Sequence, residues 1–117
     1  MPYVKPDDVT SPQDSWSLNC VFYDEGEGGI AIAFGEWDGE PVLAIRWNGT
    51  NELHKELGNP QSSGHATWFI LPPELAITIV KEILTKHFAG NNHIRPDCIP
   101  IVIAWLKNIG KLTADMY

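Results

Sequence analysis

Cysteine is scarce in this chain, and long apolar runs are absent. The two cysteines, Cys20 and Cys98, are too few for a disulfide framework, so the sequence predicts two reduced thiols buried as small apolar side chains. No apolar run approaches the ~20 residues that a membrane span needs, and the first residues hold no apolar signal-peptide core. These absences predict a cytoplasmic protein that folds around an apolar core.

Basic residues are also rare in the N-terminal third. Residues 1–40 hold nine acidic residues and a single basic one, Lys5, and the whole chain has a formal net charge of -7. This charge opposes non-specific attraction to nucleic acid or to an anionic membrane, so neither partner is expected. The length indicates one domain, 1–117, in which residues 1–15, with three prolines, form an irregular lead-in.

Metal-binding and catalytic patterns are missing as well. The four histidines, His54, His65, His87 and His93, are scattered, and no two of them lie four residues apart on one helix. The glycine-rich stretch 24–29 holds three carboxylates, which would repel phosphate, and it lacks the ending of a phosphate-binding loop. We therefore expect no catalytic residue, no metal site and no cofactor.

The chain does contain a run of strand patterns followed by helix patterns. Its centre is a hairpin with strands at 29–37 and 40–48, because the turn residues Asp38 and Gly39 tolerate positive φ angles. Alternating apolar residues predict further strands at 16–24 and 65–71. An apolar stripe that ends before Gly90 predicts a helix over 73–88. A second helix is predicted near 98–109, although the β-branched run at 101–103 leaves a strand open.

Strands before helices define an α+β fold, here a four-stranded antiparallel meander sheet with one helix packed across it and a second, C-terminal helix. The polar segment 51–58 is predicted to contain one helical turn. The C-terminal element is apolar on more than one side, through Ile99, Ile101, Val102, Ile103, Trp105, Leu106 and Ile109. We expect a homodimer that buries this surface; the alternative is that the element inserts fully into the monomer's own core.

Polar side chains gather near the ends of the predicted strands. Arg46 alternates with Ile45 and Trp47 along its strand, so we place it on the open face of the sheet, where it could bind an anion or a carbonyl group. Asn48 follows it, and the loop before the last strand carries Gln61 and Ser62. These four polar residues are predicted to line one ligand-binding site.

Three tryptophans, Trp37, Trp47 and Trp68, lie on three of the predicted strands. Together they could form an aromatic face that stacks on bases or on a small aromatic ligand. The alternative is that they fill the core between sheet and helix, because tryptophan is usually mostly buried.

Four pieces of the sequence resemble a group of small uncharacterised bacterial proteins of the kind encoded by mobile integron gene cassettes. They are Gly-Glu-Trp-Asp-Gly at 35–39, Arg-Trp-Asn-Gly at 46–49, Gly-Asn-Pro-Gln-Ser at 58–62 and Trp-Phe-Ile-Leu-Pro-Pro-Glu-Leu at 68–75. The resemblance spans 21–84 and implies a small soluble α+β protein of unknown function, without catalytic residues to carry over. The order of elements is also similar to single-strand-binding coactivator domains, from which the acidic N-terminal third departs.

These observations favour a non-enzymatic module that binds an unknown small molecule or protein, because no acid–base, metal or phosphate motif is assembled in the sequence. Two alternatives stay open. One is a sheet domain that binds single-stranded nucleic acid through its aromatics, and the other is a small enzyme whose residues come from different strands.

Overall fold

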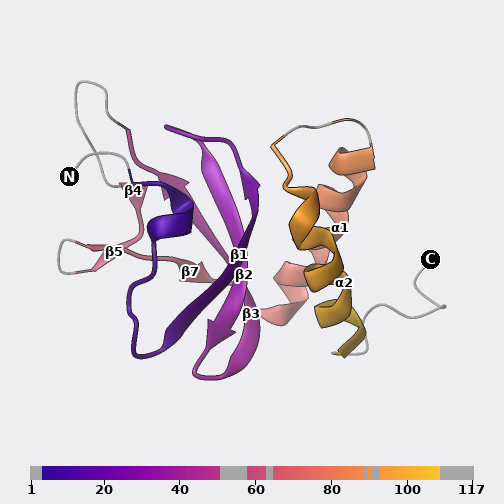
Figure 1. The fold of residues 1–117 in the computed structure, drawn as a ribbon, viewed down its shortest axis with the longest axis horizontal. Coiled ribbons are helices and arrows are strands. Elements are labelled where there is room, and N and C mark those ends of the chain that lie inside the picture. The colour runs from indigo at the N-terminus through magenta and orange to yellow at the C-terminus, as the bar shows by residue number, and fades with distance from the viewer. Residues whose placement is uncertain (1–3, 51–57, 63–64, 89, 91–92, 109–117) are drawn as a thin grey trace.

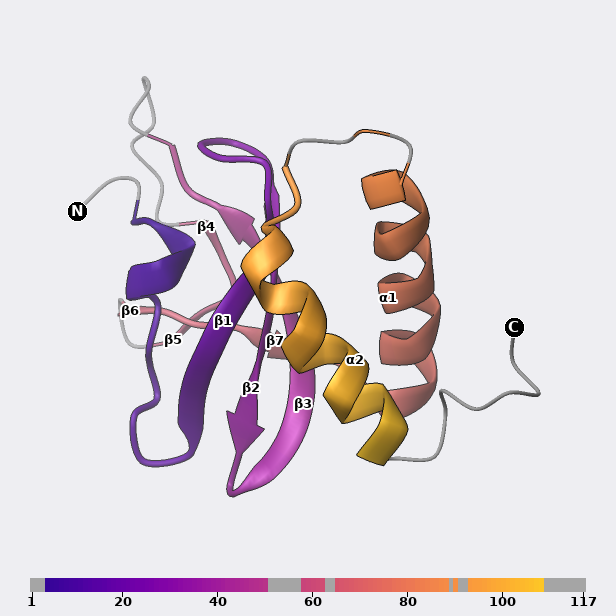
Figure 2. The ribbon, with the colours of Figure 1, turned by 45° about the vertical axis from the view of Figure 1, so that its right-hand side comes forward.

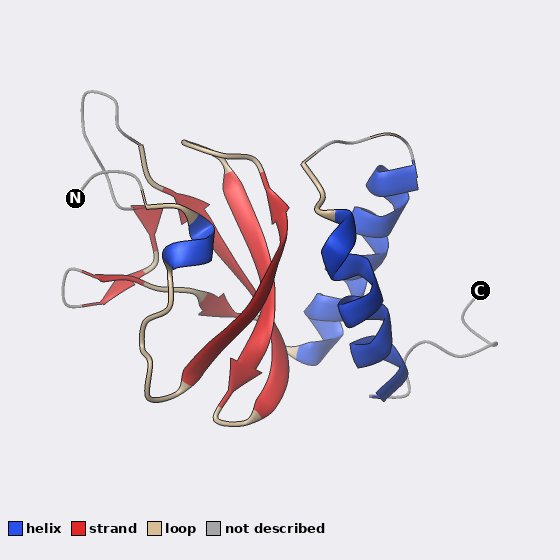
Figure 3. Cartoon of the chain, viewed as in Figure 1, coloured by secondary structure: helices blue, strands red, loops and turns tan. Residues whose placement is uncertain are grey.

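The computed structural model describes residues 4–50, 58–62, 65–88, 90 and 93–108. The described chain forms three layers (Figure 1). Two helices cover one face of a central antiparallel sheet, and the N-terminal segment with a short hairpin lies on the other face (Figure 3). This is the α+β architecture that the sequence predicts, with a four-stranded antiparallel sheet, a helix on the sheet and a C-terminal helix.

The strands of the sheet follow one another in chain order, as expected for a meander. They are β1 (Trp16–Asp24), β2 (Ile30–Trp37), β3 (Glu40–Asn48) and β4 (Gly58–Asn59), and each pairs antiparallel with its neighbour. The turn between β2 and β3 forms as predicted, because Asp38 and Gly39 have φ angles of 52° and 85° and Trp37 pairs with Glu40.

The single strand predicted over 65–71 is wrong in detail. The structure has two short strands there, β6 (His65–Ala66) and β7 (Phe69–Ile70), with different partners. β6 pairs with β5 (Gln61–Ser62) in a separate hairpin, whereas β7 pairs with the middle of β3. The break has a local cause, because the Thr67 amide donates to the Pro60 carbonyl rather than to a sheet neighbour.

The helices match their predicted bounds closely. α1 spans Pro73–Phe88, and α2 spans Ile99–Asn108 after a 3-10 turn, η2 (Pro96–Cys98), so the C-terminal element is a helix and not a strand. Both helices lie on the same side of the sheet (Figure 2). In the described part of the chain no helix is both long and apolar enough to cross a membrane. The helical turn predicted over 51–58 lies outside the described residues, except for Gly58 in β4.

Two bulges in β1 change which side chains face the helices. The register shifts between Leu18 and Cys20 and again between Val21 and Tyr23, so each shift inserts an extra residue. Strict alternation would put Cys20 on the same face as Leu18. The first bulge instead turns it toward the helices, opposite Phe34, because a bulge reverses the side-chain alternation of a strand.

The helix side of the sheet carries the larger apolar core. Phe22, Leu43, Val80 and Val102 are fully buried there. Trp105 of α2 lies edge-on to Phe34 of β2 and is 3% exposed. α2 therefore buries its tryptophan in its own chain, and the side left outside carries Ile101, which is 39% exposed.

The opposite side of the sheet, which is predicted from the sequence to be an open face, carries a second core. Val9 of the N-terminal segment, Trp16, Ala44 and Trp68 are buried there together. A short 3-10 turn, η1 (Pro6–Asp8), brings the lead-in residues over the sheet. The predicted lead-in is thus mostly irregular but forms a packed layer.

Candidate functional site

Arg46 corrects the expectation of an exposed binding residue. It lies on the face opposite Ile45 and Trp47, as alternation predicts, but this face is covered and Arg46 is 2% exposed. Its Nη1 donates to the carbonyl of Thr67, which lies in the segment between β6 and β7. Burial lowers the pKa of Arg46 from its usual value, since a charged group loses hydration there. Arg46 therefore joins the sheet to the segment that covers it.

Three of the four predicted polar residues meet around Gly58. Asn48 pairs with Gly58 across the β3–β4 ladder, and Gln61 Nε2 donates to the Gly58 carbonyl at 2.7 Å. A Cβ on Gly58 would come within 2.6 Å of Arg46 Nη2, so this guanidinium lies against the same glycine. Ser62 lies beyond this group, exposed in the β5–β6 hairpin.

Burial leaves little of this cluster open to a ligand. Asn48 is 5% exposed, and its Nδ2 donates to the Asp24 carboxylate at 3.1 Å and to the Gly26 carbonyl at 2.7 Å. Gln61 and Ser62 are exposed, whereas Arg46 and Asn48 are not. The buried members of this cluster hold the ends of the strands in place, and they are not open to a ligand.

The three tryptophans do not form one aromatic face. Trp68 is buried, donates from Nε1 to the Val9 carbonyl at 2.7 Å and lies against Trp16, and Trp37 packs partly buried in the same core. Trp47 faces the other way, on the helix side, and is 59% exposed. The alternative of core packing thus holds for Trp68, and of these three tryptophans Trp47 alone is largely exposed.

A concave surface lies next to Trp47. A cavity of about 530 Å³ is lined by Ile30, Ile45, Arg46, Trp47, Asn59, Pro60 and Phe69, and we call it the Trp47–Phe69 groove. Its floor comes from the helix face of the sheet, because Ile30 pairs with Trp47 and Ile45 pairs with Phe69. Phe69 is 57% exposed, so two large aromatic side chains border the same cavity in contact with solvent.

The groove continues toward α1. A second cavity, of about 320 Å³, shares Ile30 and Ile45 with the first and is also lined by Ile79 and Ile83 of the helix. Its lining includes three charged residues, Glu25, Glu82 and Lys86. One apolar floor therefore connects the exposed aromatics to the edge of α1.

Most residues of this groove are not among the site residues predicted from the sequence. Phe69 lies in the strand predicted over 65–71 and has no predicted role there. The signal was present in the sequence, because Trp68 and Phe69 are adjacent and adjacent strand residues point to opposite faces. Since Trp68 is buried on one face, Phe69 must point to the other, beside Ile45.

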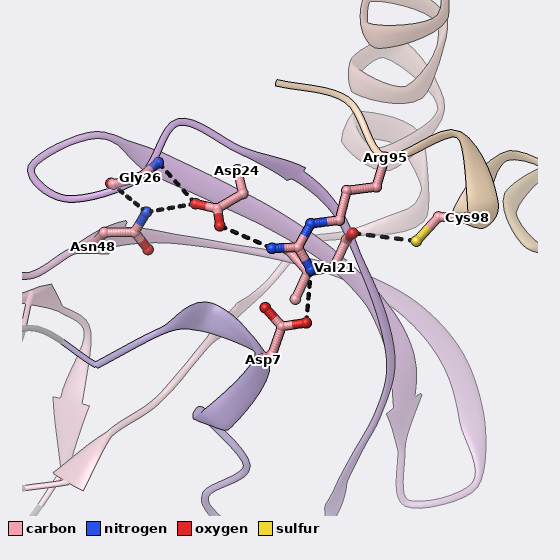
Figure 4. Close-up of polar contacts among 7 residues, drawn as sticks. All are labelled: Asp7, Val21, Asp24, Gly26, Asn48, Arg95 and Cys98. Atoms are coloured by element: carbon pink, nitrogen blue, oxygen red, sulfur yellow. Dashed lines mark hydrogen bonds and ion pairs between the residues drawn. The ribbon is translucent and has the colours of Figure 1, made fainter. Parts of the chain in front are cut away.

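A separate polar network ties the N-terminal layer to the sheet and to the segment before α2 (Figure 4). Arg95 donates to Asp7 at 2.6 Å and to Asp24 at 3.0 Å. Asp24 also accepts from Asn48 and from the Gly26 amide, at 2.8 Å. The hydrogen bond from Arg95 holds the pKa of Asp7 below its usual value. Every carboxylate oxygen of Asp24 is thus occupied within the protein, which makes this network structural.

Metal-ligating side chains do not cluster in the described residues: no group of three or more His, Cys, Asp or Glu residues is placed to hold an ion. Glu25, which lines the second cavity, accepts from the Tyr23 hydroxyl at 2.6 Å and from the Ile30 amide, and these bonds lower its pKa. The Trp47–Phe69 groove is therefore a mainly apolar surface, and the charged residues Glu25, Glu82 and Lys86 line the neighbouring cavity.

No protein-family model, curated protein or solved structure matches this chain. The resemblance to integron-cassette proteins and the cytoplasmic location stay predictions from the sequence. Any functional conclusion must come from the groove itself.

Proposed function

We propose that this chain is a non-enzymatic binding module that holds an apolar small molecule in the Trp47–Phe69 groove. The observation that carries the proposal is the pair of exposed aromatics, 59% and 57% exposed, on one concave apolar surface. A ligand that covers them removes apolar surface from water, and complete burial of one large apolar side chain is worth about 1.5–3 kcal/mol.

The dimensions of the groove favour a small molecule over a macromolecule. Its volume of about 530 Å³ is typical of ligand pockets, which are mostly apolar with a few polar groups at their edges. Asn59 supplies such a group here. A stable protein partner would need roughly 800 Å² of surface on each side, more than two aromatics and a short floor provide.

The shared floor favours an extended apolar ligand. Because Ile30 and Ile45 line both cavities, a molecule seated between Trp47 and Phe69 can continue toward Ile79 on α1. Nucleic acid is the weaker alternative, since the N-terminal third is strongly acidic and Trp47 is the one exposed tryptophan of the three on the predicted strands.

The proposal is tested with a neutral fluorescent probe, N-phenyl-1-naphthylamine, whose emission rises in an apolar site. We expect saturable binding by the wild-type chain and a loss of affinity of about tenfold or more in Trp47→Ala and in Phe69→Ala, which corresponds to about 1.4 kcal/mol. Leu75→Ala is the matched control, because Leu75 is 53% exposed but does not line the groove.

Circular dichroism would show that the three variants keep the wild-type fold. Equal affinity in wild type, Trp47→Ala and Phe69→Ala, or an absence of saturable binding in all of them, would overturn the proposal.

A further inference from the structure

The two cysteines come from distant parts of the chain but pack into one apolar core. Cys20 lies on β1 and points toward the helices only because the bulge after Leu18 reverses the alternation. It packs, partly exposed, against the apolar core that contains Cys98. The bulge thus brings the Cys20 side chain to the side on which η2 lies.

Cys98 closes the η2 turn directly against the same stretch of β1. Its Sγ donates to the carbonyl of Val21, the residue after Cys20, at 3.2 Å (Figure 4), and the side chain is buried. The neighbouring Cys98 thiol and burial raise the pKa of Cys20. The Cys20 thiol lowers the pKa of Cys98, and the nearby charge of Arg95 acts in the same direction.

We infer that Cys20 and Cys98 form a redox-active thiol pair that closes to an intramolecular disulfide when the protein meets a peroxide. This goes beyond the two reduced, buried thiols that the sequence predicts. A disulfide needs two cysteines whose Cβ atoms lie roughly 3.5–4.5 Å apart. Here the Cys98 sulfur lies beside the residue that follows Cys20, and both side chains pack into the same core.

The reaction balances with hydrogen peroxide as the oxidant. Each thiol loses one hydrogen, a bond forms between the two sulfur atoms, and the oxygen–oxygen bond of the peroxide breaks to give two molecules of water. Each sulfur is oxidised by one electron, and the two electrons reduce the peroxide. The peroxide reaches the pair from the side of Cys20, which is partly exposed whereas Cys98 is buried. Cys98, whose pKa is lowered, supplies the attacking thiolate.

Closing this bond would join the outer strand of the sheet to the start of α2. Hydrogen bonds already connect these segments, since the Arg95 amide donates to the Phe22 carbonyl and the Asp24 amide donates to the His93 carbonyl. The covalent link would also restrict the unfolded chain, because it closes a long loop between its ends. The oxidised protein should therefore be more resistant to unfolding than the reduced protein.

The test oxidises the reduced wild-type chain with one equivalent of hydrogen peroxide. We expect a monomer whose mass falls by the two lost hydrogens, no titratable thiol after denaturation, and one disulfide-linked pair of peptides that contain Cys20 and Cys98. The melting temperature should rise by about 10 °C or more, as a long-loop disulfide predicts, and should return to its starting value with dithiothreitol.

Two variants serve as controls, and both should fold. Cys20→Ser changes a partly exposed side chain, and the hydroxyl of Cys98→Ser can still donate to the Val21 carbonyl. Neither should gain thermal stability with peroxide. Two thiols that stay free in the treated wild-type protein, or disulfides formed only between separate molecules, would overturn the inference.

Discussion

Trp105 on α2 lies edge-on to Phe34 on β2, with ring centroids 5.5 Å apart and planes inclined at 62°. This contact joins the C-terminal helix to the centre of the sheet. It removes Trp105 from the surface that the sequence offered as a dimer interface, because the side chain is 3% exposed within one chain. A tryptophan so near the C-terminus is explained by packing in its own core.

Trp105→Ala should therefore destabilise the fold itself. Removing a buried tryptophan leaves a cavity and costs about 3–5 kcal/mol. Urea unfolding followed by circular dichroism would measure the loss. Ile101→Ala on the exposed side of α2 is the control and should change stability by less than about 1 kcal/mol. Similar losses in the two variants would mean that α2 does not pack as described.

The homodimer remains a prediction, and the structure narrows its possible interface. Ile101 is the large apolar side chain that α2 leaves most exposed among the described residues. If the dimer forms through this side, light scattering at micromolar concentration should give about twice 13.0 kDa, and Ile101→Glu should reduce the mass to that of one chain while keeping the fold. A wild-type mass near 13.0 kDa would refute the dimer.

Stability should fall at acid pH partly through Asp7. Arg95 lowers the pKa of this carboxyl in the folded state below the usual value of 3.8, so its contribution is present above that pH and is lost as the pH falls through the lower folded value. The side chains are 49% and 40% exposed, so solvent screens the pair and the effect should stay within about 1 kcal/mol. The free energy of unfolding, measured with urea between pH 2 and 7, should fall less at acid pH in Asp7→Asn than in the wild type. We expect the difference to be on the order of a few tenths of 1 kcal/mol. An identical loss of stability at acid pH in the two proteins would show that the ion pair between Asp7 and Arg95 does not stabilise the fold.

Gly58→Ala should be much more harmful than a comparable change at Gly28. Both glycines have positive φ angles, 88° and 78°, which cost an L-residue about 1–2 kcal/mol. At Gly58 a Cβ would in addition overlap the Trp47 carbonyl oxygen and crowd Arg46, whereas around Gly28 there is open space. Thermal unfolding of the two variants would measure both effects: Gly28→Ala reports the backbone strain alone, and Gly58→Ala reports the strain together with the steric overlap. Equal losses would show that the packing around Gly58 adjusts freely.

Single-stranded oligonucleotides should leave the tryptophan fluorescence unchanged even at low salt. The acidic N-terminal third repels the phosphate backbone of a nucleic acid. In the described structure Trp68 is buried and Trp37 is partly buried, so neither is free to stack on bases. A titration at 20 mM salt with a mixed-sequence oligonucleotide of about 15 bases would test this, since OB folds bind roughly 4–16 nucleotides. Quenching that weakens as salt rises would instead favour the nucleic-acid alternative.

The sequence alone determined the elements whose signals are local. The turn at Asp38 and Gly39 depends on backbone preferences of two residues, and α1 depends on an apolar stripe that repeats within one segment. The order of β1, β2 and β3 followed as well, because consecutive antiparallel strands joined by short turns pair with their neighbours. These features need no information from distant parts of the chain.

Only the tertiary structure decided which surfaces are covered. The N-terminal segment packs over one face of the sheet. On that face the segment between β6 and β7 contacts Arg46, which is buried although alternation alone had left it open to solvent. The first bulge in β1 turns Cys20 toward the helix side of the sheet, and the partners of β6 and β7 divide the strand predicted over 65–71. Each outcome depends on contacts between residues far apart in sequence. The local periodicity of the sequence does not reveal the energies of these long-range contacts. Side-chain alternation shows that a strand has two faces, but it does not show what packs against either face.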